Sequence, residues 1–140
     1  MKGVILAGGM GTRLYPLTKV TNKHLLPIGS FPMVHYPIIS MTNAGVDNIM
    51  VISGTGHVGD MIDFLGSGKD YEANFTFKVQ DKPDGIAGAL RLCEDFVGKD
   101  DCLVILGDNI FDRDLSKDVK EFNTDVKLFF KRVEDPERFG

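Results

Sequence analysis

Three glycines and three cationic side chains stand close together in residues 8–27, GGMGTRLYPLTKVTNKHLLP. Glycines allow a tight backbone whose N–H groups can converge on one ligand, and arginine and lysine add positive charge beside it. Such a loop can hold a phosphate group. It fits neither common phosphate-binding pattern, because Leu14 stands where a dinucleotide fingerprint needs glycine and Gly9 where a P-loop needs lysine. We therefore expect a phosphate-binding loop of another kind.

Charge is distributed unevenly along the sequence. Residues 1–46 contain four Lys or Arg residues and no Asp or Glu, so they carry +4 and leave −8 for the remainder of a chain with a net charge of −4. A local positive region in an acidic protein favours a small anion over nucleic acid in general. We expect a small phosphorylated ligand and no nucleic acid.

Two further side chains with useful chemistry follow expected strands. Asp108 comes after an apolar stretch and Gly107, where a carboxylate can meet a metal ion that bridges phosphates. An Asp-Asn pair after a strand is also a common turn, so the residues alone leave both interpretations open. Gln80 closes an alternating stretch, and its amide offers a donor and an acceptor to a base edge or simply ends a strand.

Alternating strands and helices must position these residues. Apolar runs and period-two alternation predict strands, and apolar spacing of three and four residues with glycine stops predicts helices. Strands are expected at residues 3–7, 47–53, 74–80, 101–107 and 125–133, and helices at 31–45, 56–66, 84–98 and 114–122. This order predicts an α/β fold with three α/β/α layers, a mostly parallel central sheet and ligands at the carboxyl ends of the strands.

Composition excludes several other classes of protein. With 140 residues, 43% of them hydrophobic and 26% charged, the chain has the size and composition of one soluble domain. No apolar run is long enough to span a bilayer and no signal-peptide pattern opens the chain, so we expect a cytoplasmic protein without membrane contact. Cys93 and Cys102 lack metal spacing and are expected to be buried, reduced thiols. The histidines show no ligand spacing either and are expected to be structural or surface residues: His24, His35 and His57.

The motif LAGGxGTRLxPLT followed by KxLLP resembles the signature of the sugar-nucleotide pyrophosphorylase (nucleotidyltransferase) family, most nearly that of glucose-1-phosphate thymidylyltransferases. The similarity continues in PMVHYPI at 32–38, VQDKPDGIAGAL at 79–90, VILGDNIF at 104–111 and DPERFG at 135–140. One departure is His24, which follows the motif lysine where the family often has glutamine. The resemblance implies a Rossmann-like nucleotidyltransferase fold.

The resemblance also implies a reaction. Glucose 1-phosphate would attack dTTP in line, with Mg²⁺ as cofactor, to give dTDP-glucose and pyrophosphate. The attacking phosphate is already ionised near neutral pH, so such a site needs positioned charge rather than a protein nucleophile. Three alternatives stay open: UTP or another nucleotide as donor, another sugar 1-phosphate as acceptor, or a non-catalytic subunit that binds nucleotide sugars.

Site residues carry over from the family motifs position by position. The resemblance implies catalytic roles for Arg13, Lys23 and Asp108, with Asp108 also the magnesium ligand. Lys19 is an alternative to Lys23. It implies nucleotide binding by Gly8, Gly9, Gly11, Thr12, Arg13, Gln80, Pro83 and Gly85, and sugar binding by Gly107, Asn109 and Gly140.

Members of the family continue well past the position of Gly140. We therefore expect residues 1–140 to be the nucleotide-binding part of a single nucleotidyltransferase domain, with the remainder of the domain absent from this chain. The remainder would carry the second magnesium carboxylate and most of the sugar site. In complete form the protein is expected to be a homo-oligomer.

Overall fold

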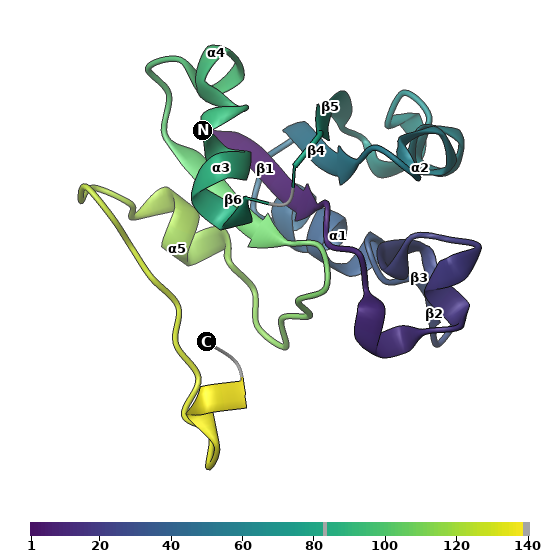
Figure 1. Ribbon diagram of the computed structural model, residues 1–140. Coiled ribbons are helices and arrows are strands. Elements are labelled where there is room, and N and C mark those ends of the chain that lie inside the picture. The colour runs from purple at the N-terminus through teal and green to yellow at the C-terminus, as the bar shows by residue number, and fades with distance from the viewer. Residues whose placement is uncertain (83, 139–140) are drawn as a thin grey trace.

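A four-stranded parallel sheet forms the centre of the protein, for which a computed structural model describes residues 1–82 and 84–138 (Figure 1). Two of the expected site residues, Pro83 and Gly140, lie outside the described residues. The strands are β1 (Lys2–Ala7), β4 (Asn48–Gly54), β5 (Asn74–Gln80) and β6 (Cys102–Leu106), in the spatial order β5-β4-β1-β6.

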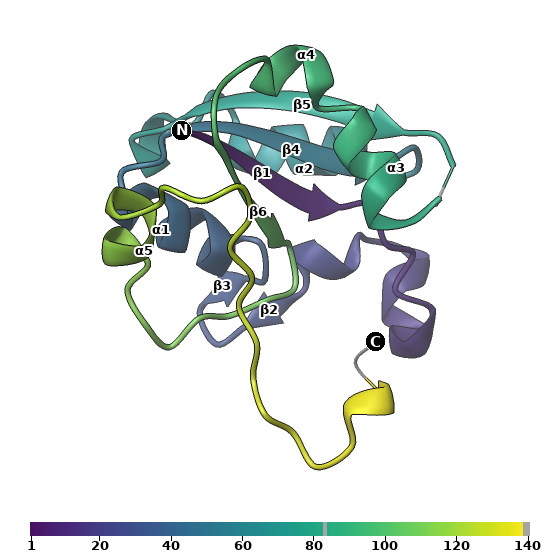
Figure 2. The ribbon, with the colours of Figure 1, turned by 90° about the vertical axis from the view of Figure 1, so that its left-hand side faces the viewer.

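Helices cover both faces of this sheet, because its central strands carry apolar side chains on both faces. Ile5 and Val51 pack with apolar residues of α1 (His35–Asn43) and α2 (Val58–Leu65). Val4 and Ile52 pack on the other face with α3 (Gly85–Arg91) and α4 (Glu94–Val97) (Figure 2). The expected three-layer α/β/α arrangement with a parallel sheet is confirmed.

Shorter elements complete the described chain. They are the 3₁₀ turns η1 (Thr12–Leu14), η2 (Leu17–Lys19), η3 (Lys23–Leu25), η4 (Lys69–Tyr71) and η5 (Pro136–Arg138), the two-residue strands β2 (Pro27–Ile28) and β3 (Phe31–Pro32), and the helix α5 (Ser116–Lys120). Ser116 at the start of α5 donates its backbone N–H to Asp114 Oδ1 at 2.8 Å, so the Asp114 side chain satisfies one of the free N–H groups at the start of this helix.

The expected helices at 56–66 and 114–122 are each shorter by one or two residues at either end, and the other two differ more. The first begins at His35 instead of residue 31, because Phe31 and Pro32 pair with β2 in an antiparallel hairpin. Pro37 then lies in the first turn, where a missing N–H costs no helical hydrogen bond. The helix expected over 84–98 is divided into α3 and α4, because Leu92 and Cys93 donate to carbonyls three residues back and tighten the backbone between them.

The strand expected at residues 125–133 is not formed. The segment runs away from the sheet, and its apolar side chains Val126, Leu128 and Phe130 are 69%, 68% and 88% exposed (Figure 2). A strand needs a neighbour to pair with its backbone, and alternation in the sequence does not supply one. Within the described residues no strand pairs with this segment.

Two expectations drawn from composition can also be compared with the structure. Cys93 is buried between α3 and α4, as expected, but Cys102 at the start of β6 is exposed, so its predicted burial is wrong. Among the described residues, no helix is both long enough and apolar enough to cross a membrane.

Candidate functional site

The expected site residues that the structure describes lie at one edge of the sheet. Parallel strands end on the same side, and the register pairs Ala7 with Ser53, Gly54 with Gln80, and Leu6 with Leu106. The residues that follow β1 and β6 therefore emerge at the same edge of the sheet as the end of β5. Figure 2 shows the loop after β1 and the start of α3 at the arrow ends of the strands. This edge contains the glycine loop, Gln80 and Asp108.

Residues 8–27, which we call the glycine loop, fold back on themselves through Gly11. Gly11 has φ of +60°, and its carbonyl accepts a hydrogen bond from Thr18 Oγ1 at 2.9 Å. A Cβ at Gly11 would lie 2.8 Å from Thr18 Cγ2 and 2.9 Å from Lys23 Cβ. Glycine is therefore needed both for the backbone conformation and for the close approach of Lys23.

Gly8 and Gly9 leave room for two functional side chains to reach across the start of the loop. A Cβ on Gly9 would lie 3.3 Å from Lys23 Cε, and a Cβ on Gly8 would lie 2.8 Å from Gln80 Oε1. The lysine and the amide thus approach the same short piece of backbone. A ligand bound at Gly8 and Gly9 would touch both.

Lys23 and Asp108 form an ion pair across this edge. Lys23 Nζ lies 2.5 Å from Asp108 Oδ2, with side-chain exposures of 22% and 41%. Burial alone raises the pKa of the Asp108 carboxyl, but the hydrogen bond and positive charge of Lys23 outweigh burial and hold that pKa below its usual value. Asp108 is therefore an accessible carboxylate, ionised at neutral pH.

Asn22 and His24, the residues on either side of Lys23, are buried and hold this part of the loop against the strand ends. Asn22 Nδ2 donates to the Ala7 carbonyl at 3.2 Å and to Ser53 Oγ at 3.5 Å. Asn22 Oδ1 accepts the His24 backbone N–H at 2.9 Å and lies 2.6 Å from His24 Nδ1. Asn22 therefore ties Lys23 to the ends of β1 and β4.

His24 is uncharged and structural, in agreement with the sequence-based expectation. Burial, together with the charge of Lys23, lowers the pKa of His24 from its usual 6.5 to about 4. Its Nδ1 carries a hydrogen, because the oxygen of Asn22 is already fixed as an acceptor by the His24 backbone. The ring packs so closely on Gly107 that a Cβ there would lie 2.8 Å from His24 Cδ2. Gly107 thus serves packing at the end of β6.

The role of Asn22 was missed in the sequence. One signal was available, since asparagine is among the preferred residues just before a helical turn and Asn22 caps η3 in this way. That signal predicts a local cap only. The bonds from Asn22 to β1 and β4 depend on tertiary structure.

Gln80 and Gly85 lie close together, as expected of a pair that reads a base. Gln80 Nε2 donates to Asp84 Oδ1 at 2.7 Å and lies 3.4 Å from the Gly85 carbonyl. Gly85 begins α3 with φ of +87°. Asp84 itself was not among the expected site residues.

Three other expected site residues are at the same edge without side-chain contacts to this group. Thr12 and Arg13 lie in η1 and are exposed, and Arg13 forms no ion pair with any other described residue. Asn109 is exposed in the tight turn after β6, where its N–H bonds the Leu106 carbonyl at 3.0 Å. All three residues are exposed at this edge of the sheet.

Asp108 offers a magnesium ion a carboxylate beside the glycine loop. Within residues 1–82 and 84–138 no group of three or more His, Cys, Asp or Glu side chains is placed to hold a metal. Mg²⁺ in nucleotide sites commonly takes one or two carboxylates and completes its shell with phosphate oxygens and water. Asp108, ionised and 41% exposed, fits a ligand of that kind.

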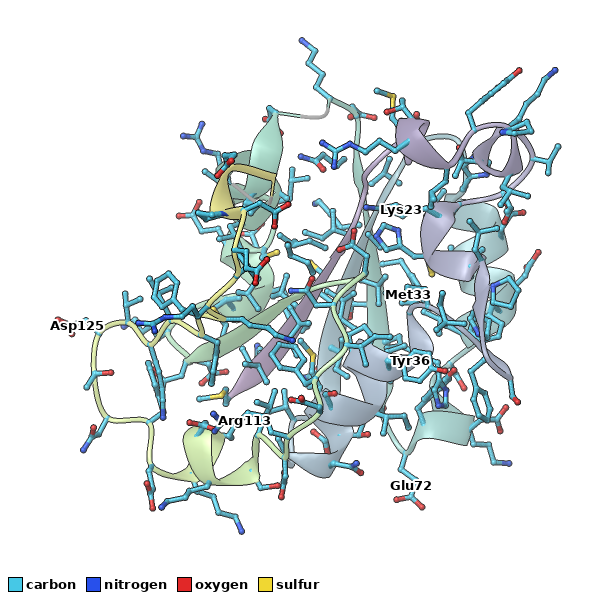
Figure 3. All side chains as sticks on the ribbon, turned by 90° about the horizontal axis from the view of Figure 1, so that it is seen from below. Lys23, Met33, Tyr36, Glu72, Arg113 and Asp125 are labelled. Carbon is cyan, nitrogen blue, oxygen red and sulfur yellow. The ribbon has the colours of Figure 1, made fainter. Side chains whose placement is uncertain are left out.

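A separate cavity of about 890 Å³ lies between α1 and residues 111–115, lined among others by Tyr36 and Arg113. It contains none of the expected site residues. Figure 3 shows Arg113 well apart from Lys23. The chemistry expected from the sequence is therefore gathered at the sheet edge rather than in this cavity.

Comparisons with known proteins agree with this architecture. The sequence profile of a family described as nucleotidyl transferase matches residues 2–140. A glucose-1-phosphate thymidylyltransferase of Neisseria meningitidis is 40% identical over 144 residues, which cover 100% of this chain and 50% of the relative. One of Xanthomonas campestris is 41% identical over 145 residues, which cover 99% of this chain and 48% of the relative. The chain thus spans about half the length of these curated relatives.

Solved structures of nucleotidyltransferases also resemble this chain. A candidate glucose-1-phosphate thymidylyltransferase from Bacillus anthracis, solved with sucrose, superposes with a TM-score of 0.84 at 56% identity, covering 86% of this chain and 49% of that one. A UDP-glucose pyrophosphorylase complexed with UDP-glucose superposes with a TM-score of 0.69 at 24% identity, covering 85% of this chain and 52% of that one. The second similarity concerns the fold alone.

Proposed function

Because the chain belongs to the nucleotidyl transferase family, we propose that it is the nucleotide-binding part of a nucleotidyltransferase domain that joins a nucleoside triphosphate to a sugar 1-phosphate. The observation that carries the proposal is the meeting of the glycine loop, Lys23 and Asp108 at the carboxyl edge of the sheet. The finer proposal is that dTTP and α-D-glucose 1-phosphate give dTDP-glucose and pyrophosphate. Thymidylyltransferase relatives at 40% and 41% identity support that choice.

In the proposed reaction the glycine loop binds the triphosphate. Backbone N–H groups at residues 8–13 hold phosphate oxygens, and the exposed Arg13 guanidinium binds the part that leaves as pyrophosphate. Lys23 Nζ supplies a positive charge beside Gly9, and its neighbours Asn22 and His24 hold the backbone of the loop at this position. Fixed charges need no reorganisation as negative charge develops on the reacting phosphates, so they stabilise the transition state.

The sugar phosphate is its own nucleophile in this proposal. It arrives ionised and needs only to be held in line with the α-phosphorus, so no side chain has to remove a proton from it. Gly107 and Asn109 at the end of β6 are proposed to contact the sugar. The proposed role of this chain is therefore to position the two substrates and to neutralise the charge of their phosphates.

Asp108 is the residue proposed to hold Mg²⁺. When bound, the ion would neutralise phosphate charge and help to align the two substrates. Asp108 is ionised because Lys23 lowers its pKa, and exchange of Lys23 for the cation would leave the lysine free to contact phosphate. Both groups would then face the same ligand.

Gln80 and Gly85 are proposed to bind the base. A thymine or uracil ring offers an N–H between two carbonyls, and a side-chain amide with a neighbouring backbone group can satisfy that edge. The Gln80 amide at the end of β5 lies next to Gly8 of the glycine loop, although β4 separates β5 from β1 in the sheet. This arrangement supports a pyrimidine nucleotide at the site.

Pyrophosphate release tests the proposal. The protein with its complete nucleotidyltransferase domain is incubated with Mg²⁺, glucose 1-phosphate and either dTTP, UTP, ATP or GTP, and pyrophosphate is measured over time. We expect release to require both substrates and to be fastest with dTTP. Faster release with UTP would correct the nucleotide while keeping the chemistry. Tight nucleotide binding with no release under any pairing would contradict catalysis and favour a binding subunit.

A further inference from the structure

Asp84 determines which atom of the Gln80 amide faces the glycine loop. Gln80 Nε2 lies 2.7 Å from Asp84 Oδ1. A carboxylate can only accept hydrogen bonds, so the amide nitrogen must point to Asp84 and the amide oxygen must point the other way. In agreement, Gln80 Oε1 is the atom that lies above Gly8, 2.8 Å from the place of a Cβ there.

Glycine at two other positions makes this arrangement possible. Gly54 pairs with Gln80 in the sheet register, and a Cβ at Gly54 would lie 3.3 Å from the Gly8 carbonyl oxygen, so glycine there lets the Gly8 backbone lie close to the end of β4. Gly88 lies one turn into α3, and a Cβ there would be only 2.1 Å from both Cγ and Oδ1 of Asp84. The Asp84 carboxylate thus occupies the space that a Gly88 side chain would fill.

From these contacts we propose that Asp84, which packs against Gly88, sets base specificity by fixing the Gln80 amide with its oxygen toward the ligand. The inference rests on the proposed nucleotide site at this edge. Asp84 is a positioning residue, because it acts through Gln80 and is turned toward α3. Gln80 Oε1 then accepts a hydrogen bond and selects a base whose ring nitrogen carries a hydrogen.

This orientation discriminates between two bases of the same size. Thymine presents N3–H as a donor, which pairs with Gln80 Oε1. Cytosine presents N3 as an acceptor, which faces the oxygen lone pairs and leaves both groups without a partner. An unpaired buried acceptor costs more than an ordinary hydrogen bond contributes, so the fixed amide favours dTTP over dCTP.

Asparagine in place of Asp84 keeps the shape of the side chain but no longer fixes the orientation of the Gln80 amide. In Asp84→Asn the new amide can either accept from Gln80 Nε2 or donate to Gln80 Oε1, so Gln80 can turn over. We expect the ratio of dTTP to dCTP affinity to fall about tenfold, the size of one matched hydrogen bond. The fall should come from weaker dTTP binding together with stronger dCTP binding, which a general loss of structure would not produce.

Gly88→Ala tests the same control of Gln80 by Asp84 without changing any charge. The added methyl group displaces the Asp84 carboxylate, while alanine in place of glycine inside a helix favours the helix itself. The dTTP to dCTP ratio should therefore fall in a protein that is at least as stable. Asp81→Asn, which neutralises another exposed carboxylate of the same connection, is the matched control and should leave the ratio unchanged.

The experiment is calorimetric titration of the wild type and the three variants with dTTP and with dCTP in Mg²⁺. A wild-type preference for dTTP that falls in Asp84→Asn and Gly88→Ala, but not in Asp81→Asn, supports the inference. An unchanged preference for dTTP in Asp84→Asn and Gly88→Ala overturns the inference and leaves the proposed function intact. An equal fall of the preference in Asp81→Asn has the same consequence. A wild type that binds neither nucleotide overturns the proposed function and the inference with it.

Discussion

Lys23 Nζ and Asp108 Oδ2 lie 2.5 Å apart, although the two residues are 85 positions apart in the sequence. The lysine comes from the loop after β1 and the aspartate from the turn after β6, and these strands are neighbours in the sheet. The contact therefore brings together the two charges that a phosphate and a metal ion would need. Loss of Lys23 would also remove the hydrogen bond and the positive charge that lower the pKa of Asp108.

Asp108→Asn should abolish the effect of Mg²⁺ on dTTP binding. The substitution keeps the size of the side chain and removes the negative charge that would hold the cation. Titration of dTTP with and without Mg²⁺ measures this effect, and circular dichroism checks that the fold is retained. A variant whose dTTP affinity still rises with Mg²⁺ as in the wild type would make Asp108 a turn residue.

Arg13→Ala should weaken dTTP binding by about tenfold or more, because a charge-assisted hydrogen bond to phosphate contributes about 1.5 to 3 kcal/mol. Lys19→Ala is the matched control, since Lys19 is an exposed cation of the same loop. Equal losses in the two variants, or a larger loss in Lys19→Ala, would show that overall loop charge and not Arg13 contacts the nucleotide.

His24 should make stability depend on pH. Its pKa is lowered to about 4 in the folded protein, so between about 4 and 6.5 the unfolded chain binds more protons. The stabilisation is fully present above pH 6.5 and is lost as pH falls toward 4, by up to about 3 kcal/mol.

Urea unfolding at pH 7.5 and pH 4.5 measures this loss, and His24→Gln serves as the comparison. The glutamine variant does not titrate in this range and should lose less stability on acidification, which also separates His24 from other groups such as His35. Equal losses in the wild type and His24→Gln would show that His24 is not the group responsible.

Gly11→Ala should destabilise the protein and weaken nucleotide binding. An L-residue in the left-handed region costs about 1–2 kcal/mol, and the new Cβ would also press on Thr18 and Lys23. Gly45→Ala is the control, because Gly45 has φ of +79° with no atom within 4 Å of its Cβ position. Both variants should lose stability in urea, but only Gly11→Ala should bind dTTP less tightly.

Most of the sheet could be predicted from the sequence, because the buried strands are continuous apolar runs and the parallel order places their ends at one edge. The grouping of the glycine loop, Gln80 and Asp108 followed from that topology. The division of the helix at Leu92 could not be predicted, since both halves have apolar residues at helical spacing.

Other features depend on tertiary contacts that no local pattern contains. Residues 125–133 alternate like a strand, yet a strand forms only against a neighbour. Asn22 resembles an ordinary cap in the sequence, and its bonds to Ala7 and Ser53 appear only in the fold. Asp84 lies next to a predicted base-binding glycine, but its effect on Gln80 depends on the space above Gly88.

The position of a bound nucleotide tests the central claim most directly. A crystal structure of the protein with dTTP and Mn²⁺, used as an anomalous marker for Mg²⁺, would locate the triphosphate and the metal ion independently. We predict the triphosphate against the backbone of residues 8–13 with Lys23 in contact, the metal ion on the Asp108 carboxylate, and thymine beside Gln80. A triphosphate bound elsewhere, with no anomalous peak at Asp108, would contradict the account.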